Sequence, residues 1–299
     1  MERSFAAIAE RLSAQLRERL EPRPAASVHG GCINECFKWQ RSSGFLFVKL
    51  AEDARRSMLE AEAAGLEELA AAQAVRVPRV LAVGSAGGRA YLALEWIELS
   101  PGSSGSTQAR LGEQLARQHR KTAERFGWHR DNTIGSTPQI NTPAMSWPEF
   151  FRDARLRYQL RLAERNACGG RLQERGAQLL DRIAEFFADH RPVPSLLHGD
   201  LWGGNAAADE HGAPVLFDPA VYYGDREADL AMTRLFGGFS PAFYSAYEAA
   251  WPLPASAGSR VDLYNLYHVL NHLNLFGGGY LRQAESMIDR LLAAGRGPA

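Results

Sequence analysis

The sequence predicts an α+β fold with two lobes: a small N-terminal lobe built on an antiparallel sheet and a larger, mainly helical C-terminal lobe. Strand patterns rich in aromatic and β-branched residues alternate with helical patterns up to residue 97, whereas helical patterns dominate from about residue 106 onward. Antiparallel strands mixed with helices typically pack as an α+β unit. A chain of 299 residues with 45% hydrophobic content can bury a large core.

Hydrophobic periodicity locates the elements of the first lobe. Apolar residues from Phe5 to Leu20 recur at helical spacing, so residues 4–20 are expected to form an amphipathic helix. Residues 41–44 and the pair Gly87-Gly88 are typical of turns between strands. The other elements expected in this lobe are strands at 27–40, 45–50, 80–83 and 90–97 and a helix at 54–72.

A stretch rich in Gly, Ser and Pro from Leu99 to Gly105 marks the expected boundary between the lobes. We therefore predict an N-terminal lobe at residues 1–99 and a C-terminal lobe at residues 100–299. The helical pattern of the second lobe is interrupted by short strand candidates at 195–197, 206–208 and 215–217.

Composition excludes several classes of function. Basic and acidic residues number 34 each, so no global field attracts nucleic acid or an anionic membrane, and a small-molecule partner fits better. The three cysteines show no C-x-x-C pattern, which argues against a disulfide framework and against a zinc site. The N-terminal segment is charged, and no apolar run reaches the roughly 20 residues of a membrane span. We expect a cytoplasmic protein, either a monomer or a homodimer.

The stretch from His198 to Asn205 carries the strongest chemical signal. Asp200 precedes Asn205 by five positions, and Asp218 follows 13 positions after Asn205. Phosphoryl transfer uses this order, because a catalytic Asp accepts the proton of a substrate hydroxyl while an Asn and a second Asp hold Mg²⁺. A turn Asp that only caps backbone donors is the alternative for Asp200 alone. Together with the two-lobed organisation, the spacing predicts a protein-kinase-like fold that uses ATP and Mg²⁺.

Lys49 ends the apolar strand pattern Phe45–Leu50. Burial of an ammonium group is costly unless an anion meets it, so a nucleotide phosphate or a carboxylate is the expected partner. An exposed position at the strand end is the alternative. The next helix offers Glu60 and Glu62, and we favour Glu62 because it shares one helical face with apolar residues.

Two further segments are candidates for nucleotide contacts. Gly30, Gly31 and Asn34 lie between strand patterns, where backbone amides can approach phosphates, although an ordinary hairpin turn has the same signature. Cys32 would lie at the tip of this loop and could be redox-active or inert. The second candidate segment consists of Glu95, Trp96 and Ile97. It lies just before the boundary between the lobes, where the hinge of a kinase lies, and could contact adenine.

Other polar residues are expected to be structural or remain ambiguous. We predict that Asp225 caps a helix and that Asp229 accepts hydrogen bonds from backbone amides of the Asp200 loop. His268 and His272 share a helix face, but they lack the Glu of a zinc-protease motif and are expected in the core or at the surface. The helix around them, residues 263–274, either lines a polyol pocket or packs in the core.

The chain resembles the fructosamine kinases, or ketosamine 3-kinases, within the aminoglycoside-phosphotransferase-like branch of the kinase fold. The resemblance extends over nearly the whole chain. It rests on segments 30–34, 47–49, 126–128, 131–132 and 134–135 with Gln139, and on 198–205, 218–220, 222–232, 235–239 and 274–280.

The resemblance implies ATP-dependent phosphorylation of the 3-hydroxyl of a ketosamine, a sugar adduct of an amine, and thereby deglycation. It implies that Asp200 is the base, that Asn205 and Asp218 bind Mg²⁺, and that Lys49 with Glu62 holds the nucleotide phosphates. Residues 95–97 are then implied to contact adenine. Trp202 resembles the platform on which the sugar stacks, since an indole face packs well against sugar C–H groups. Gly203 stands where many relatives carry Ser.

Two alternatives stay open at this point. The same fold could phosphorylate an aminoglycoside, choline or another hydroxyl compound, although cationic acceptors generally call for an acidic pocket, and few carboxylates follow Asp229. A nucleotide-binding protein without catalysis is the other alternative. It would have no need for Lys49, Asp200, Asn205 and Asp218 together.

Overall fold

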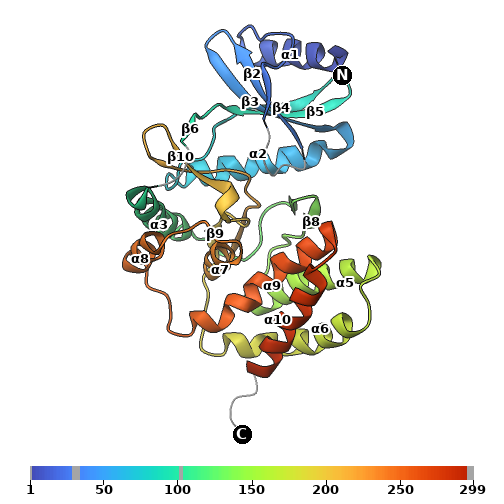
Figure 1. Cartoon of the computed structure of the whole chain (residues 1–299), viewed down its shortest axis with the longest axis vertical. Coiled ribbons are helices and arrows are strands. Elements are labelled where there is room, and N and C mark those ends of the chain that lie inside the picture. The colour runs from blue at the N-terminus through green and yellow to red at the C-terminus, as the bar shows by residue number, and fades with distance from the viewer. Residues whose placement is uncertain (1, 29–33, 101–103, 295–299) are drawn as a thin grey trace.

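The computed structural model describes residues 2–28, 34–100 and 104–294, and it confirms the two-lobed α+β fold (Figure 1). The small lobe comprises α1 (Glu2–Leu16), β1 (Ala26–Val28), β2 (Glu35–Arg41), β3 (Gly44–Glu52), α2 (Arg56–Ala71), β4 (Val80–Ala86) and β5 (Arg89–Glu95). The large lobe follows β6 (Leu99–Ser100) and contains short strands and many helices. Within its described residues these are α3 (Gly105–His119), β7 (Asn132–Ile134), β8 (Thr137–Gln139), α4 (Trp147–Phe150), the π-helical turn Phe151–Arg157, α5 (Tyr158–Arg165), α6 (Arg171–Asp181), β9 (Ser195–Leu197), β10 (Ala206–Asp209), β11 (Pro214–Leu216), β12 (Tyr222–Gly224), α7 (Glu227–Leu235), α8 (Pro241–Ala250), α9 (Ala257–Phe276) and α10 (Tyr280–Ala294).

The sheet of the small lobe has the strand order β1-β2-β3-β5-β4, with antiparallel neighbours throughout. The strand β5 lies between β3 and β4 and is buried on both faces, to which its successive side chains point in alternation. Tyr91 and Ala93 pack with α1 in one apolar cluster, whereas Leu92 and Leu94 pack with α2 in the other. The two helices therefore cover opposite faces of the sheet (Figure 1).

The large lobe packs around the long helix α9, which contacts α5, α7 and α10. Three small antiparallel sheets are also present in the described residues: β7 with β8, β9 with β12, and β10 with β6 and β11. The sequence did not predict β7, β8 and β12, since strands of three residues are too short to show a period. Within the described ranges, no helix is both long enough and apolar enough to cross a membrane.

The stretch expected as a linker is in part a strand. Leu99 and Ser100 form β6 and pair with Asp209 and Ala208 of β10, and the Ser100 hydroxyl donates to the carbonyl of Asp209 at 3.0 Å. A two-residue strand leaves no periodic signal, and here its backbone groups are satisfied by the neighbouring lobe. Residues 101–103 of the predicted linker lie outside the described residues.

Candidate active site

The loop that carries Asp200 leaves the buried strand β9 and is held by Asp229. The carboxylate of Asp229 accepts the backbone amide of His198 at 2.7 Å and that of Gly199 at 2.9 Å, which confirms the role predicted for Asp229. Gly199 has φ +81°, and a Cβ on it would collide with the carbonyl oxygen of Ala220. The loop can therefore approach the segment after Asp218 only with glycine at this position.

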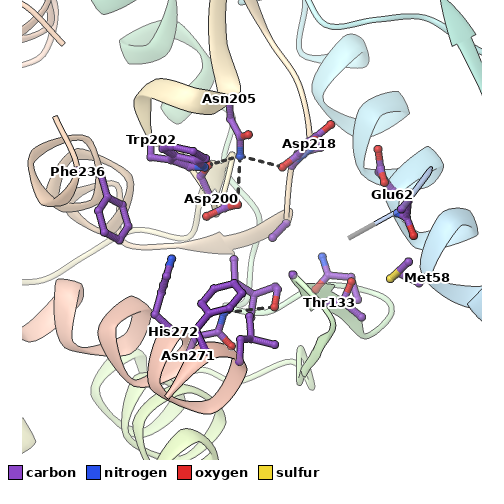
Figure 2. A pocket seen from close by; sticks show the side chains of 18 of the residues that line it. Met58, Glu62, Thr133, Asp200, Trp202, Asn205, Asp218, Phe236, Asn271 and His272 are labelled. Atoms are coloured by element: carbon purple, nitrogen blue, oxygen red, sulfur yellow. Dashed lines mark hydrogen bonds between the residues drawn. The ribbon is translucent and has the colours of Figure 1, made fainter. Parts of the chain in front are cut away.

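Asn205 fixes the orientation of the Asp200 carboxylate. Its Nδ2 donates to Oδ2 of Asp200 at 3.1 Å and to the carbonyl of Asp200 at 2.9 Å (Figure 2). Removal from water, reinforced by the charge of Asp218, raises the pKa of Asp200 to about 7. A carboxylate with this pKa can accept a proton near neutral pH, which suits a general base.

Asp218 lies beside Asn205 and contributes to the same face of the cleft (Figure 2). Nδ2 of Asn205 also lies 3.4 Å from the carbonyl of Asp218. Oδ1 of the Asn205 side chain therefore points away from this carbonyl. An amide oxygen and a carboxylate are ligands that Mg²⁺ prefers. A cation here would also offset the repulsion between the carboxylates of Asp200 and Asp218. The residues thus fit a magnesium site.

Lys49 is only 2% exposed and lies between two carboxylates. Its Nζ is 2.6 Å from Oε1 of Glu62 and 2.6 Å from Oδ1 of Asp218. Burial alone would lower the pKa of Lys49, but the two negative charges outweigh it and raise that pKa, so the side chain stays cationic. The choice of Glu62 over Glu60 is confirmed, since Glu60 instead pairs with Arg56 on the helix surface.

Two adjoining cavities meet at this cluster. One, of about 470 Å³, holds Asp200, Lys49 and Glu62 and opens toward the large lobe. The other, of about 590 Å³, lies under β5 and the hinge. Trp202, Asn205 and Asp218 line both, so a molecule in one cavity could reach a molecule in the other across these three residues.

The hinge residues Glu95, Trp96 and Ile97 all line the second cavity, together with Phe47, Leu94 and Phe217. The carboxylate of Glu95 accepts hydrogen bonds from Nη2 of Arg76 at 2.7 Å and from the amide of Arg79 at 3.2 Å.

The glycine-rich candidate loop is described only at its end. Gly30, Gly31 and Cys32 lie outside the described residues, so their expected roles stay predictions. Asn34 lies at the edge of the cavity that holds Asp200 and Lys49.

Aromatic side chains form the wall of the first cavity opposite Lys49, and most of them were missed by sequence reasoning. Ring centroids are 6.1 Å apart between Trp202 and Phe236, 4.9 Å between Phe236 and His272, and 5.2 Å between His272 and Tyr280 (Figure 2). Nδ1 of His272 is 2.8 Å from the carbonyl of His268 and can only donate there, which leaves Nε2 as an acceptor. Burial lowers the pKa of His272, so the ring is neutral at pH 7.

Helix α9 thus contributes to the cavity wall: Asn271, His272, Leu275 and Phe276 line the cavity. Of the two alternatives for residues 263–274, the pocket-lining one holds for the C-terminal end of the segment, whereas His268 is buried at 5% exposure. The sequence signals for His272 were its place on one face with His268 and its position in the segment 263–274, for which a pocket-lining role was one alternative.

Comparison with known proteins places the chain in a family. Residues 4–294 match the family model described as fructosamine kinase. The chain belongs to the fructosamine kinase family. A Synechocystis protein named a probable ketoamine kinase is 46% identical over 286 residues, which cover 95% of this chain and 96% of the relative. The chloroplastic protein-ribulosamine 3-kinase of Arabidopsis thaliana is 44% identical over 269 residues, covering 89% of this chain and 82% of the relative.

Solved structures agree with the family assignment. A crystal structure of a Haemophilus somnus protein provisionally described as a fructosamine-3-kinase superposes with a TM-score of 0.88 at 28% identity, covering 97% of this chain and 98% of that one. An aminoglycoside phosphotransferase in complex with ADP and hygromycin B reaches a TM-score of 0.66 at 15% identity, and this likeness concerns the fold alone.

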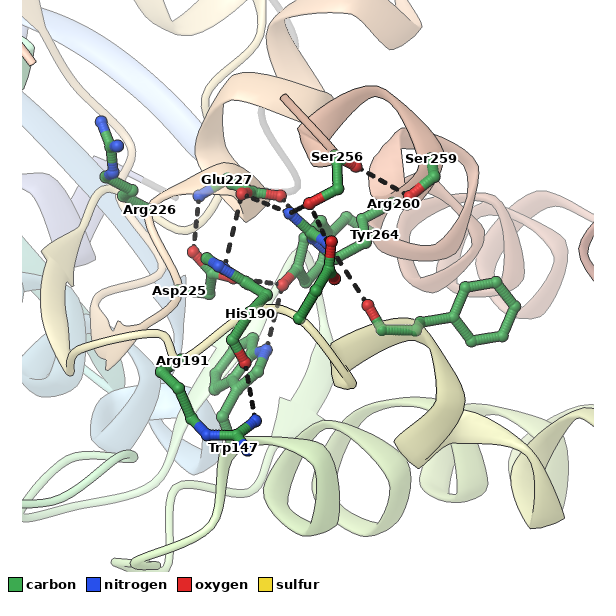
Figure 3. Close-up of polar contacts among 12 residues, drawn as sticks. Trp147, His190, Arg191, Asp225, Arg226, Glu227, Ser256, Ser259, Arg260 and Tyr264 are labelled. Atoms are coloured by element: carbon green, nitrogen blue, oxygen red, sulfur yellow. Dashed lines mark hydrogen bonds and ion pairs between the residues drawn. The ribbon is translucent and has the colours of Figure 1, made fainter. Parts of the chain in front are cut away.

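A second polar cluster of this fructosamine kinase family member lies around the start of α7 (Figure 3). His190, Asp225 and Glu227 bring ligand-type atoms within 4.8 Å of one another. Arg260 donates to Glu227 at 2.8 and 2.9 Å, and the Tyr264 hydroxyl donates to Asp225 at 2.5 Å. Protein donors therefore already satisfy these carboxylates, and the cluster ties α7 to α9.

The capping role of Asp225 differs in detail from the prediction. The N-cap position of α7 is Arg226, because the helix begins at Glu227. Asp225 lies one residue earlier, yet its Oδ1 still accepts the amide of Glu227 at 3.1 Å. A short Asx turn thus precedes the helix, and the Asp supports the helix start from outside the cap.

Proposed function

We propose that the chain is an ATP-dependent kinase that phosphorylates the 3-hydroxyl of ketosamines such as fructosamine, ribulosamine or erythrulosamine adducts, and so leads to deglycation. The observation that carries the proposal is the position of Asp200. Its carboxylate, with a pKa raised to about 7, lies in one cavity with Asn205 and Asp218 on one side and an aromatic wall on the other. The names of the relatives from Synechocystis and Arabidopsis support ketosamines as the acceptor class.

The roles of the side chains follow from this placement. Asp200 accepts the proton of the attacking hydroxyl, and Asn205 with Asp218 holds Mg²⁺, which neutralises phosphate charge when bound. Lys49, fixed by Glu62, pairs with the nucleotide phosphates in place of Asp218.

As part of this proposal, Gly30, Gly31 and Asn34 are assigned to phosphate binding, and Glu95, Trp96 and Ile97 to adenine binding. Residues 1–99 then form the nucleotide-binding lobe and residues 100–299 the catalytic and acceptor-binding lobe.

The acceptor half of the first cavity suits a sugar. Trp202 and Phe236 offer apolar faces for sugar C–H groups, and Nε2 of His272 offers an acceptor for a hydroxyl. The side chains on this wall carry no carboxylate: they are Trp202, Phe236, Asn271, His272, Leu275, Phe276 and Tyr280. A polycationic aminoglycoside would find no anionic side chain among these seven residues. We further propose that the enzyme works in the cytoplasm on free or protein-bound adducts, as a monomer or homodimer.

The proposal is tested by ATP consumption with fructose-lysine, ribulose-lysine and erythrulose-lysine beside a panel of aminoglycosides and choline. We expect turnover with at least one ketosamine, product phosphorylated at the 3-hydroxyl, and none with the antibiotics. Turnover only with antibiotics or choline would overturn the acceptor class. Binding of ATP without turnover of any acceptor would favour a non-catalytic nucleotide-binding protein.

A further inference from the structure

Five buried polar side chains lie directly behind the segment that follows Asp218. They come from β7, β8, the loop after β8, the π-helical turn and α9, and none is more than 8% exposed: Asn132, Gln139, Asn141, Arg155 and Tyr267. Asn132 itself lines the first cavity, as do the next two residues of β7, Thr133 and Ile134. The hairpin β7–β8 therefore belongs both to the cavity wall and to this polar cluster.

Two of these side chains donate hydrogen bonds to the backbone just after Asp218. Nε2 of Gln139 lies 3.0 Å from the carbonyl of Ala220, and Nδ2 of Asn132 lies 2.8 Å from the carbonyl of Val221. The amide of Ala220 in turn donates to the carbonyl of His198 at 2.9 Å. The same short segment is thus held by the β7–β8 hairpin on one side and by the Asp200 loop on the other.

The orientation of the amides is fixed from both ends of the cluster. Arg155 can only donate, and its Nη2 donates to Oδ1 of Asn141 at 2.8 Å. Nδ2 of Asn141 must then face Oδ1 of Asn132, at 2.9 Å, and Nδ2 of Asn132 must face the carbonyl of Val221. The carbonyl of Val221 can only accept a hydrogen bond, so it requires Nδ2 of Asn132 to point toward it. Arg155, at the other end of the chain of hydrogen bonds, requires the same orientation of Asn132.

Gln139 is oriented in the same way. The Tyr267 hydroxyl donates to its Oε1 at 2.8 Å, and its Nε2 is shared between Oδ1 of Asn132, at 2.9 Å, and the carbonyl of Ala220. Both carbonyls of the segment therefore receive donors whose direction the surrounding side chains determine.

The held segment matters because Asp218 has φ +55°, a left-handed conformation that is unfavourable for a residue with a Cβ. Such a conformation persists where the surroundings impose it. Only Pro219, whose ring fixes its own φ, separates Asp218 from Ala220. Hydrogen bonds that fix the backbone of Ala220 and Val221 therefore also restrict the backbone conformation of Asp218.

We propose that Asn132 and Gln139 are positioning residues, which hold Asp218 in its left-handed conformation through the carbonyls of Val221 and Ala220 and so set the metal-nucleotide site. This inference rests on the proposed role of Asp218 in binding Mg²⁺. Each acts through the backbone of the segment, by its hydrogen bond to the carbonyl of Val221 or Ala220.

The test replaces an amide donor by a carboxylate of the same shape. Gln139→Glu puts an oxygen against the carbonyl of Ala220, and Gln139→Met removes the donor without adding charge. Gln173→Glu is the matched control, since Nε2 of Gln173 likewise donates to two carbonyls, those of Leu160 and Cys168, at 3.0 and 2.9 Å. For each variant, the affinity for ADP is measured with and without Mg²⁺, and hydrogen exchange is followed over residues 218–224.

We expect both Gln139 variants to lose about tenfold in the Mg²⁺-dependent gain of ADP affinity, to keep the metal-free affinity, and to exchange faster over residues 218–224. Gln173→Glu should keep the metal-dependent gain even where it lowers the melting temperature equally. Wild-type metal dependence and exchange in both Gln139 variants, or equal losses in Gln173→Glu, would overturn the inference. If the wild type itself shows no effect of Mg²⁺, the proposed role of Asp218 fails, and the exchange data still decide whether Gln139 holds the segment.

Discussion

The hydroxyl of Tyr223 donates a hydrogen bond to Oε1 of Glu68 at 2.7 Å, which ties β12 of the large lobe to helix α2 of the small lobe. Helix α2 also comes close to the residue before β12, because a Cβ on Gly65 would lie 3.2 Å from the Val221 side chain. Glu62, which holds Lys49, stands on the same helix. The position of the Lys49–Glu62 pair is therefore linked to the backbone that follows Asp218.

Tyr223→Phe should weaken nucleotide binding although Tyr223 does not line either cavity. Loss of one hydrogen bond to a carboxylate costs about 1.5 kcal/mol of free energy or more. Without this bond, α2 is held less firmly against β12. We expect KM for MgATP to rise by up to about tenfold, with a smaller change in KM for the acceptor. Tyr244→Phe, which removes a hydroxyl 3.1 Å from Thr233 far from the cleft, is the control and should leave both constants unchanged. Equal effects of the two substitutions would contradict a role for the Tyr223–Glu68 bond.

Asp200→Asn should remove the base without removing the nucleotide site. General-base catalysis typically contributes about 10²- to 10⁴-fold, so kcat should fall by that order. The amide still fits beside Asn205, and the dissociation constant for MgADP should change little. Steady-state kinetics and ADP titration measure the two quantities separately. Turnover retained near the wild-type level would remove Asp200 from the role of base.

His272→Ala should affect the acceptor and leave the nucleotide unaffected. Nε2 of the neutral ring faces the cavity as an acceptor, and its loss removes about one hydrogen bond together with ring contacts to Phe236 and Tyr280. We expect KM for the best ketosamine to rise about tenfold, and KM for ATP to stay within about twofold. His211→Ala is the control, because this ring is exposed and lies outside both cavities. An increase in KM for ATP alone would contradict a role of His272 in binding the acceptor.

The sequence was sufficient where one local pattern implied one partner. Lys49 at the end of an apolar strand required an anion, and the face shared by Glu62 with apolar residues identified it; the pair lies at 2.6 Å. Asp229 was likewise predicted as the acceptor for the Asp200 loop, because a buried Asp near a glycine turn needs backbone donors.

The sequence was insufficient where residues converge only in three dimensions. Phe236 directly follows α7 and His272 lies on α9, and no spacing in the chain indicates that the centroids of their rings lie 4.9 Å apart. The amide of Gln139 belongs to a three-residue strand, too short for periodicity to reveal which face it uses. The direction of the Glu95 side chain depends on Arg76, which arrives from the end of α2.

The buried carboxylate of Asp229 should make stability depend on pH. Burial alone would raise the pKa of Asp229, but the hydrogen bond from His119 and the amide of Gly199 outweigh it, and the pKa lies below its ordinary value. A group with a lowered pKa in the folded state stabilises the fold fully above its unfolded pKa of about 3.9, and this contribution is lost as pH falls through the folded pKa. Asp229→Asn should therefore cost about 3 kcal/mol of unfolding free energy at pH 7, since two buried backbone donors lose a charged acceptor.

The difference in unfolding free energy between wild type and Asp229→Asn should stay constant from pH 7 to about pH 5 and shrink below about pH 4. Urea denaturation at several pH values measures it. Asp262→Asn is the control, because its pairing with Arg290 is largely exposed and contributes about 0–1 kcal/mol. A difference that stays constant down to pH 3, or that grows on acidification, would show that Asp229 does not act as the charged acceptor that holds the Asp200 loop.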